Sequence, residues 1–281
     1  MQSSQFKRSL SQIYLKSIPF LTIIIGVAFG HTNYKIYVPL GILNACLMVF
    51  ACRMLIASAI KKQDAAKNQL VLIGFLLIIP WMLLAMLAGL GPPPFSEPAE
   101  YVASGTEQQV RYSFLLISGM LIGFGFAILR ENLKKTEEHF YSWLGLIAIL
   151  MAIPLFVVNM AFYNSFFLET FRIVVSSGSN KMPEWFLPIK SAVVVVMVVE
   201  VALTYLATAA FAASLKAAGW FDKTASHIYI TVGILSCISA VFSTFLPEPI
   251  ATGCSIVCIP ALPFIMPYFM GINLLKRAGN G

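Results

Sequence analysis

The stretch PIKSAVVVVMVVEVALTYLATAAFAASL, residues 188–215, decides the fold of this chain. It is longer than the roughly 20 apolar residues that a helix needs to cross the hydrocarbon core of a bilayer. In lipid such a stretch must be helical, because no water is present to satisfy the backbone polar groups. Glu200, near its middle, is its only acidic residue. An ionisable group at that depth costs roughly 2.5–3.5 kcal/mol, so it is first read as functional.

The same apolar pattern recurs along the whole chain. Of the 281 residues, 59% are hydrophobic and 11% are charged, whereas about a quarter are charged in ordinary soluble proteins. The stretches long enough to span a membrane are 13–31, 36–60, 70–90, 110–130, 141–163, 188–215, 227–246 and 250–275. No segment between them is long enough for a separate soluble domain. The sequence therefore predicts an all-α fold, a single polytopic domain over residues 1–281 with about eight transmembrane helices.

The basic residues orient this bundle. With a cytoplasmic N-terminus, fourteen of the 19 Lys and Arg residues fall on the cytoplasmic side and five on the outer side. This bias is the positive-inside pattern of membrane proteins. We therefore expect both termini in the cytoplasm and the cytoplasmic (inner) membrane of a bacterium as the location. The net charge of +7 then indicates contact with anionic lipid heads, and we expect no nucleic-acid partner.

The N-terminal region has a second interpretation. Lys7, Arg8 and Lys16 precede or enter an apolar run, as in a secretory signal peptide. Cleavage would leave an odd number of spans and no exported soluble domain. We therefore interpret residues 13–31 as the first transmembrane helix.

Glu200 begins a polar stripe along one face of its helix. Thr204 and Thr208 follow it at i+4 and i+8, which places the three residues on the same side. Desolvation favours the neutral form of a buried carboxyl, so this residue suits a proton-coupled carrier or a site for a cationic or hydrogen-bonding solute. The alternative is a neutral Glu that hydrogen-bonds to a neighbouring helix and only fixes the packing. The sequence leaves both open.

Other spans offer polar partners for Glu200. Ser236, Ser239 and Ser243 form an i, i+3, i+7 stripe on the span 227–246, and two amides, Asn44 and Asn159, lie in the spans 36–60 and 141–163. Each of these side chains alone is more often a hydrogen bond between helices than a ligand. Together with Glu200 they would line a polar substrate pocket that opens outward.

The last span is expected to be broken. Pro260, Pro263 and Pro267 lie within residues 250–275, and each proline removes a helical hydrogen bond and clashes with the preceding turn. Broken helices at membrane depth are tolerated where they are buried in protein or line a cavity, and in transporters they often form the site. We expect these prolines to act in gating. The alternative is a kinked packing helix without a function.

A short amphipathic helix is predicted between two of the spans. Phe167, Phe171, Val174 and Val175 recur at helical spacing in the connection that follows the span 141–163. Because the other face is polar, this segment is expected to lie on the outer membrane surface.

Residues for catalysis or metal binding are sparse. The patterns H-E-x-x-H, G-x-S-x-G and G-x4-G-K-[ST] are absent from the sequence, which makes an enzyme less favoured. Cys254 and Cys258 are one helical turn apart without a nearby His or acid, and we read them as small buried hydrophobes. Only His139 and His227 share a depth at which they could bind a haem together. We predict no cofactor and no metal.

The sequence therefore favours a small-solute transporter or channel-like carrier with a protonatable Glu in mid-membrane. The solute and the proton would be its partners, besides the lipid bilayer. The rival interpretation is a non-catalytic membrane subunit, sensor or scaffold that docks a partner. A third, an intramembrane enzyme acting on lipid, would need an acid–base pair that the spacing of residues does not reveal.

Overall fold

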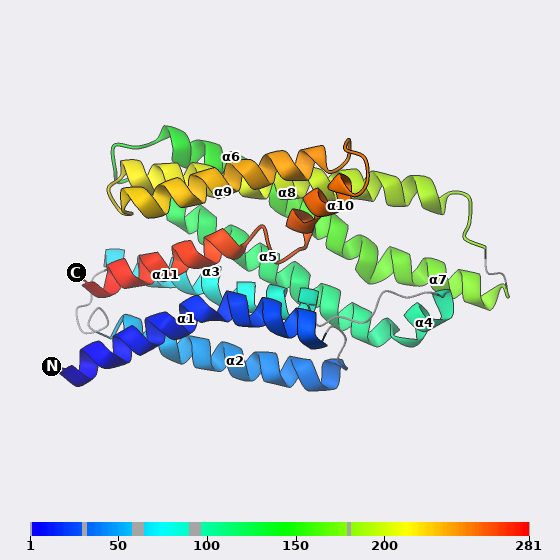
Figure 1. Ribbon diagram of the computed structural model, residues 1–281, viewed down its shortest axis with the longest axis horizontal. Helices are drawn as coiled ribbons and strands as arrows, with labels where there is room; N and C mark the ends of the chain where they lie inside the picture. The colour runs from blue at the N-terminus through cyan, green and yellow to red at the C-terminus, as the bar shows by residue number, and fades with distance from the viewer. Residues whose placement is uncertain (1, 30–32, 58–64, 90–96, 179–180, 281) are drawn as a thin grey trace.

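The computed structural model describes residues 2–29, 33–57, 65–89, 97–178 and 181–280, and these residues form helices and the connections between them (Figure 1). The α-helices are α1 (Gln2–Phe29), α2 (Tyr34–Leu55), α3 (Ala65–Gly89), α4 (Pro98–Ala103), α5 (Gly105–Leu133), α6 (Phe140–Ala161), α7 (Phe167–Ser176), α8 (Phe186–Ala217), α9 (Lys223–Phe242), α10 (Ile250–Ser255) and α11 (Ile265–Asn280). A π-helical turn, η1 (Phe162–Phe166), and a 3₁₀ turn, η2 (Ile256–Cys258), complete the elements. The all-helical prediction is confirmed.

Seven helical segments of the described chain are long and apolar enough to cross a membrane. They are Phe6–Gly26, Tyr34–Leu55, Ala65–Met86, Gly105–Leu133, Phe140–Ser176, Phe186–Ala217 and Lys223–Phe242. Their outward faces carry exposed Leu, Ile, Val and Phe side chains, such as Leu40, Leu150, Val195 and Leu235. A soluble protein does not leave so many large apolar side chains on its surface, so this belt faces lipid. The protein is an integral membrane protein.

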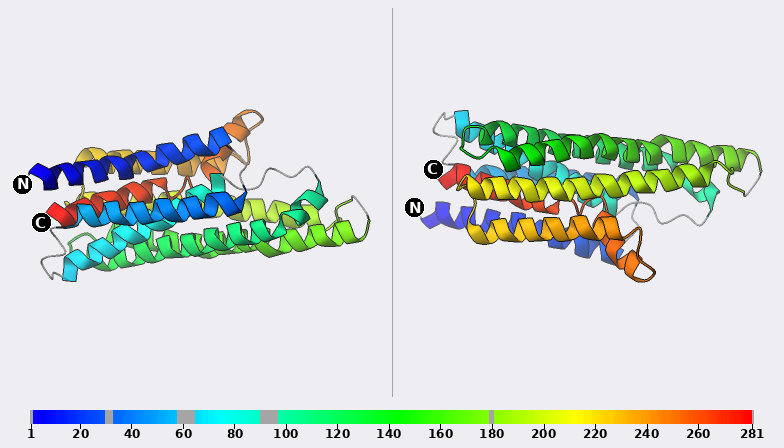
Figure 2. Two further views of the ribbon diagram at one scale, coloured as in Figure 1. Left: turned by 90° about the horizontal axis from the view of Figure 1, so that it is seen from below. Right: turned by 90° about the horizontal axis from the view of Figure 1, so that it is seen from above.

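The eighth predicted span, 250–275, is not one helix. It consists of α10, η2, an irregular stretch over 259–264 and then α11, which is too short to be counted with the seven. The prediction of a break is confirmed and that of a spanning helix is corrected. Together, these pieces still return the chain to its starting end, because both termini lie at the same end of the long axis (Figures 1 and 2).

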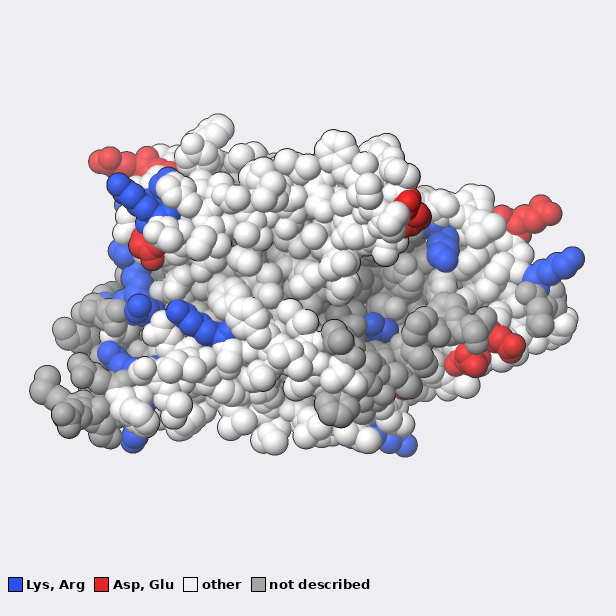
Figure 3. Space-filling view, viewed as in Figure 1, with Lys and Arg blue, Asp and Glu red and all other residues white. Residues whose placement is uncertain are grey.

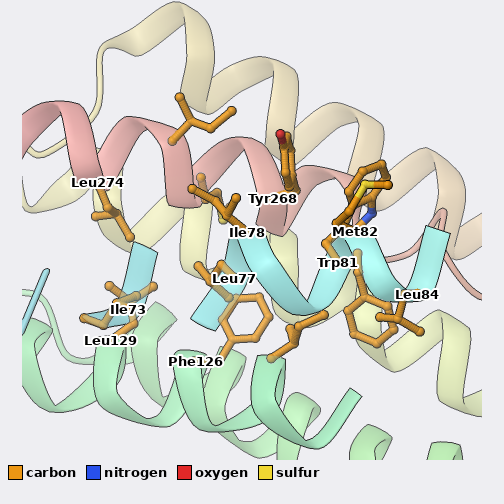
Figure 4. Packing of buried hydrophobic residues seen from close by; sticks show 14 of the residues in the cluster. Ile73, Leu77, Ile78, Trp81, Met82, Leu84, Phe126, Leu129, Tyr268 and Leu274 are labelled. Carbon is orange, nitrogen blue, oxygen red and sulfur yellow. The ribbon is translucent and has the colours of Figure 1, made fainter. Parts of the chain in front are cut away.

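The core is built around α3, the most enclosed of the seven segments. It packs most extensively against α5 on one side and α11 on the other. Figure 4 shows Leu77 facing Phe126 of α5, while Ile78 lies toward α11. Trp81 packs against Tyr268 with ring centroids 4.6 Å apart. A second group of helices, α6, α8 and α9, is joined to this core through α5.

The predicted surface helix at 164–175 is corrected in its placement. Helix α6 continues through the π turn η1 into α7, so that residues 140–176 form one apolar segment. Three of the four residues that defined the predicted surface helix are instead covered by protein, and Val175 stays exposed. Phe167, Phe171 and Val174 are buried, and both phenylalanine rings make edge contacts with Tyr101 of α4.

Charged side chains gather at the two ends of the long axis. On the face seen in Figure 3, Lys, Arg, Asp and Glu lie toward these ends and the band between them is largely uncharged. This distribution fits a bundle whose long axis crosses the bilayer.

Candidate functional site around Glu200

Glu200 lies in the interior of the bundle. It is 3% exposed and belongs to α8, which packs most extensively against α6 and α9. Several residues on its C-terminal side are small and buried, among them Ala207, Ala209, Ala210 and Ala212. Small side chains let the neighbouring helices approach closely. The Glu200 side chain is therefore buried, as expected from its place in an apolar stretch.

The polar stripe that follows Glu200 is also buried. Thr204 and Thr208 are fully enclosed, and each hydroxyl donates to the carbonyl four residues earlier, Thr204 to Glu200 O at 2.9 Å and Thr208 to Thr204 O at 3.0 Å. Threonine in a membrane helix satisfies its hydroxyl in this way. The Thr204 side chain also lies beside the Glu200 carboxyl group.

Two further groups lie within electrostatic range of the carboxyl. They are the hydroxyl of Tyr205 and the thiol of Cys258. Cys258 belongs to the 3₁₀ turn η2, which lies between the α-helices α10 and α11. It packs with Val201, Tyr205 and Ala240 in one buried cluster. The structure therefore brings the carboxyl of α8 next to α9 and the broken segment.

The broken segment has its backbone capped by side chains. Tyr205 donates its hydroxyl to Val257 O at 3.1 Å, and Trp81 donates its indole N–H to Ala261 O at 3.0 Å. Ser239 of α9 donates at 3.4 Å to Cys254 O, in α10 just before this segment. A carbonyl that is freed from a helix in the membrane costs several kcal/mol unless it finds a donor. Helices α3, α8 and α9 supply those donors.

The three prolines have two different positions. Pro260 and Pro263 lie in the irregular stretch between η2 and α11, as expected. Pro267 lies in the first turn of α11 and does not break it. A first-turn residue has no helical acceptor for its N–H, so proline is tolerated there. For Pro267 the expected interruption is therefore wrong.

The serine stripe of α9 faces the same region. Ser236 lies within hydrogen-bonding reach of the Tyr205 hydroxyl, and Ser243 within reach of the Cys258 thiol. Ser243 also donates to Ala240 O at 2.7 Å. Ser236 and Ser243 of the stripe therefore lie beside the two groups described near Glu200.

The two asparagines are not together. Asn159 is 2% exposed on α6, the helix against which α8 packs, and its Oδ1 has no hydrogen-bond partner among the described residues. Asn44 lies on α2, where it contacts Tyr14 of α1 and Met82 of α3. Helix α2 packs against α1, α3 and α11. The structure therefore does not bring Asn44 to the pocket that we expected around Glu200.

Sequence reasoning missed Tyr205 and Trp81. Both are almost fully buried aromatic residues with a polar tip inside apolar helices. Such residues usually find a hydrogen-bond partner when they are buried, and a broken segment elsewhere in the chain needs donors. These two facts together could have linked both residues to residues 256–264.

The described residues give little support to a metal or haem site. The described residues contain no group of three or more His, Cys, Asp or Glu side chains that could hold a metal ion, and all five cysteines are free thiols. His227 lies 2.7 Å from Lys216 through its Nε2. His139 is the residue that precedes α6.

No protein-family model, curated protein or solved structure matches this chain. The function must therefore be argued from the geometry of its own residues.

Proposed function

We propose that this protein is a small-solute transporter of the bacterial inner membrane, with both termini in the cytoplasm. Glu200 is its protonatable or coordinating centre, and the segment 256–264 is its moving element. The observation that carries the proposal is a buried carboxyl group near Cys258, in a membrane segment that is not α-helical. In transporters, broken helices commonly form the binding site near the middle of the membrane.

The chemistry of this arrangement suits coupling. A carboxyl group in a site of low dielectric changes the local field strongly when it gains or loses a proton or a bound cation. Next to it, two carbonyl groups of the segment 256–264 each accept one side-chain hydrogen bond, from Tyr205 and from Trp81. Each such bond contributes only about 0.5–1.5 kcal/mol net. In this proposal, a change of charge at Glu200 shifts the segment.

The lining follows from the same neighbourhood. Ser236, Ser239 and Ser243 supply hydroxyl groups from α9, and Asn159 supplies a buried carbonyl oxygen that no described residue uses. Pro260 and Pro263 keep the segment from becoming helical. Asn44 does not belong to this site.

Liposomes that contain the purified protein and an entrapped pH-sensitive dye test this proposal. A panel of amino acids, sugars and organic cations is added outside, and solute uptake and proton flux are followed at several pH values. We expect one class of solute to be taken up with a pH dependence that Glu200→Gln removes. Glu184→Gln is the matched control, because Glu184 is exposed outside the helices, and it keeps the wild-type behaviour.

The result that contradicts the proposal is uptake by Glu200→Gln with unchanged pH dependence. Gln keeps the size and the hydrogen-bonding capacity of the side chain, so we expect this variant to fold. Its thermal unfolding in detergent is measured beside the wild type. A loss of transport with wild-type unfolding then reports on the carboxyl group itself.

The second candidate is a non-catalytic membrane subunit, sensor or scaffold. Two observations favour this second candidate. Glu200 is closely packed, and the hydroxyls of Thr204 and Thr208 donate to carbonyls of their own helix, so neither is left free for a solute. Glu200 would then only fix the helix packing. In that case the wild-type protein moves none of the solutes, and Glu200→Gln changes its unfolding temperature alone.

A further inference from the structure

A cavity of about 520 Å³ lies between α1, α2 and α3, on the opposite side of the core from α8 and α9 (Figure 1). This size is within the range of roughly 300–1,000 Å³ that is typical of small-molecule sites. Its walls are almost entirely apolar. They include Ile18 and Ile25 of α1, Ile36 and Leu40 of α2, and Met82 and Met86 of α3.

The cavity opens toward lipid. Ile25, Ile36 and Leu40 line it and are 43%, 56% and 60% exposed on helices that cross the membrane. An exposed apolar side chain on such a helix contacts lipid, not water. A ligand therefore reaches this cavity from the bilayer, and it must itself be soluble in lipid.

Two polar groups in the wall lack a good partner: the Tyr37 hydroxyl has none among the described residues, and the Asn44 amide has only weak ones. Asn44 accepts a hydrogen bond from the hydroxyl of Tyr14 at 2.5 Å through Oδ1. Its Nδ2 faces only thioether sulfurs, Met82 Sδ at 3.1 Å and Met48 Sδ at 3.9 Å. A thioether has no hydrogen to donate, which fixes the amide orientation, and it is a weak acceptor. A hydrogen bond from Asn44 Nδ2 to an oxygen acceptor would therefore be stronger than its contacts with the two sulfurs.

We propose that this cavity binds a lipid-soluble molecule with an apolar body and a carbonyl oxygen, which accepts a hydrogen bond from Asn44 Nδ2. The apolar body fills the space between Ile18, Ile25 and Leu40. An ordinary hydrocarbon chain would fill the same volume, but it would leave the amide with its sulfur partners. The carbonyl oxygen is therefore what separates a specific ligand from bulk lipid. This site is independent of the one around Glu200.

Photolabelling of the full-length protein in liposomes tests the proposal. The probes are a long-chain methyl ketone and the matching alkane, each with an aliphatic diazirine, and mass spectrometry locates the labelled peptides. We expect the ketone to label the peptides of α1 and α2 about fivefold more than the alkane, as one hydrogen bond allows. On the lipid-facing surface of α9 the two probes label equally.

Two substitutions separate the amide from the cavity. Asn44→Leu removes the donor, and we expect the ratio of ketone to alkane labelling on α1 and α2 to fall to one. Tyr14→Phe removes the neighbouring hydroxyl but keeps the amide, and the ratio remains. Thermal unfolding in detergent, measured beside the wild type, shows that each variant is folded. A ratio of one in the wild type, or a ratio that survives Asn44→Leu, would mean that the cavity holds hydrocarbon chains without recognising an oxygen.

Discussion

At the scale of single residues, Pro19 in α1 leaves a backbone carbonyl that another helix must satisfy. A proline has no N–H, so Pro19 cannot donate to Leu15 O, its acceptor in a regular helix. The hydroxyl of Tyr268 in α11 donates to Leu15 O instead, at 2.5 Å. Both Leu15 and Tyr268 are fully buried.

We therefore predict that Tyr268→Phe lowers the free energy of unfolding by about 1–3 kcal/mol, the cost of an unsatisfied buried acceptor. In a Pro19→Ala background the helix supplies the missing N–H, so the same substitution should cost clearly less. Chemical unfolding in detergent of the four proteins of this cycle measures the coupling. Tyr141→Phe is the control, because Tyr141 is exposed. Equal costs of Tyr268→Phe in both backgrounds would show that the hydroxyl does not serve this carbonyl.

The sequence predicts the burial of a single residue better than it predicts which residues contact it. The burial of Glu200 follows from its place in an apolar stretch, and the structure has it. The neighbours of Asn44 do not follow, because hydropathy gives the depth of a residue but not which helices pack side by side. Asn44 is therefore a member of a different cavity from the one expected.

At the scale of elements, α3 and α11 cross at two glycines. A Cβ atom added to Gly271 would lie 2.9 Å from Ile78 Cγ1 and 3.1 Å from the backbone oxygen of Gly74. The side chain could adjust, but the backbone oxygen could not without moving the helix. This contact sets the position of α11, and thus the end of the broken segment.

We predict that Gly271→Val destabilises the protein by about 1–3 kcal/mol, the usual cost of overpacking, and raises hydrogen exchange in residues 256–264. Gly253→Val is the matched control, because nothing lies within 4 Å of the added Cβ at Gly253. Thermal unfolding in detergent and hydrogen–deuterium exchange with mass spectrometry measure the two effects. Wild-type exchange in the segment, despite a lower stability, would separate the α3–α11 contact from the position of the segment.

The elements themselves differ in how far the sequence determines them. The seven long helices follow from hydropathy, and the break after α10 follows from proline chemistry. The placement of α7 does not, because its apolar face is compatible with lipid or protein. Only the tertiary contact of Phe167 and Phe171 with Tyr101 of α4 decides between the two.

At the scale of the whole molecule, the number of crossings decides the relation between the termini. Seven full crossings would put the N- and C-termini on opposite sides of the membrane. The return made by α10, η2 and α11 puts both at one end of the bundle (Figure 2). From the distribution of Lys and Arg along the sequence we expect that end to face the cytoplasm.

We therefore predict that a reporter attached to either terminus stays in the cytoplasm of a bacterial host. Green fluorescent protein should be fluorescent at both positions, and alkaline phosphatase, which needs export to become active, should be inactive at both. A peptide tag inserted after Ser177, in the connection between α7 and α8, is the control and should react with an impermeant label from outside. An active phosphatase at the C-terminus alone would mean that the broken segment does not return the chain across the membrane. If both termini were exported together, the chain would still return to its starting side, but the orientation predicted by the positive-inside pattern would be wrong.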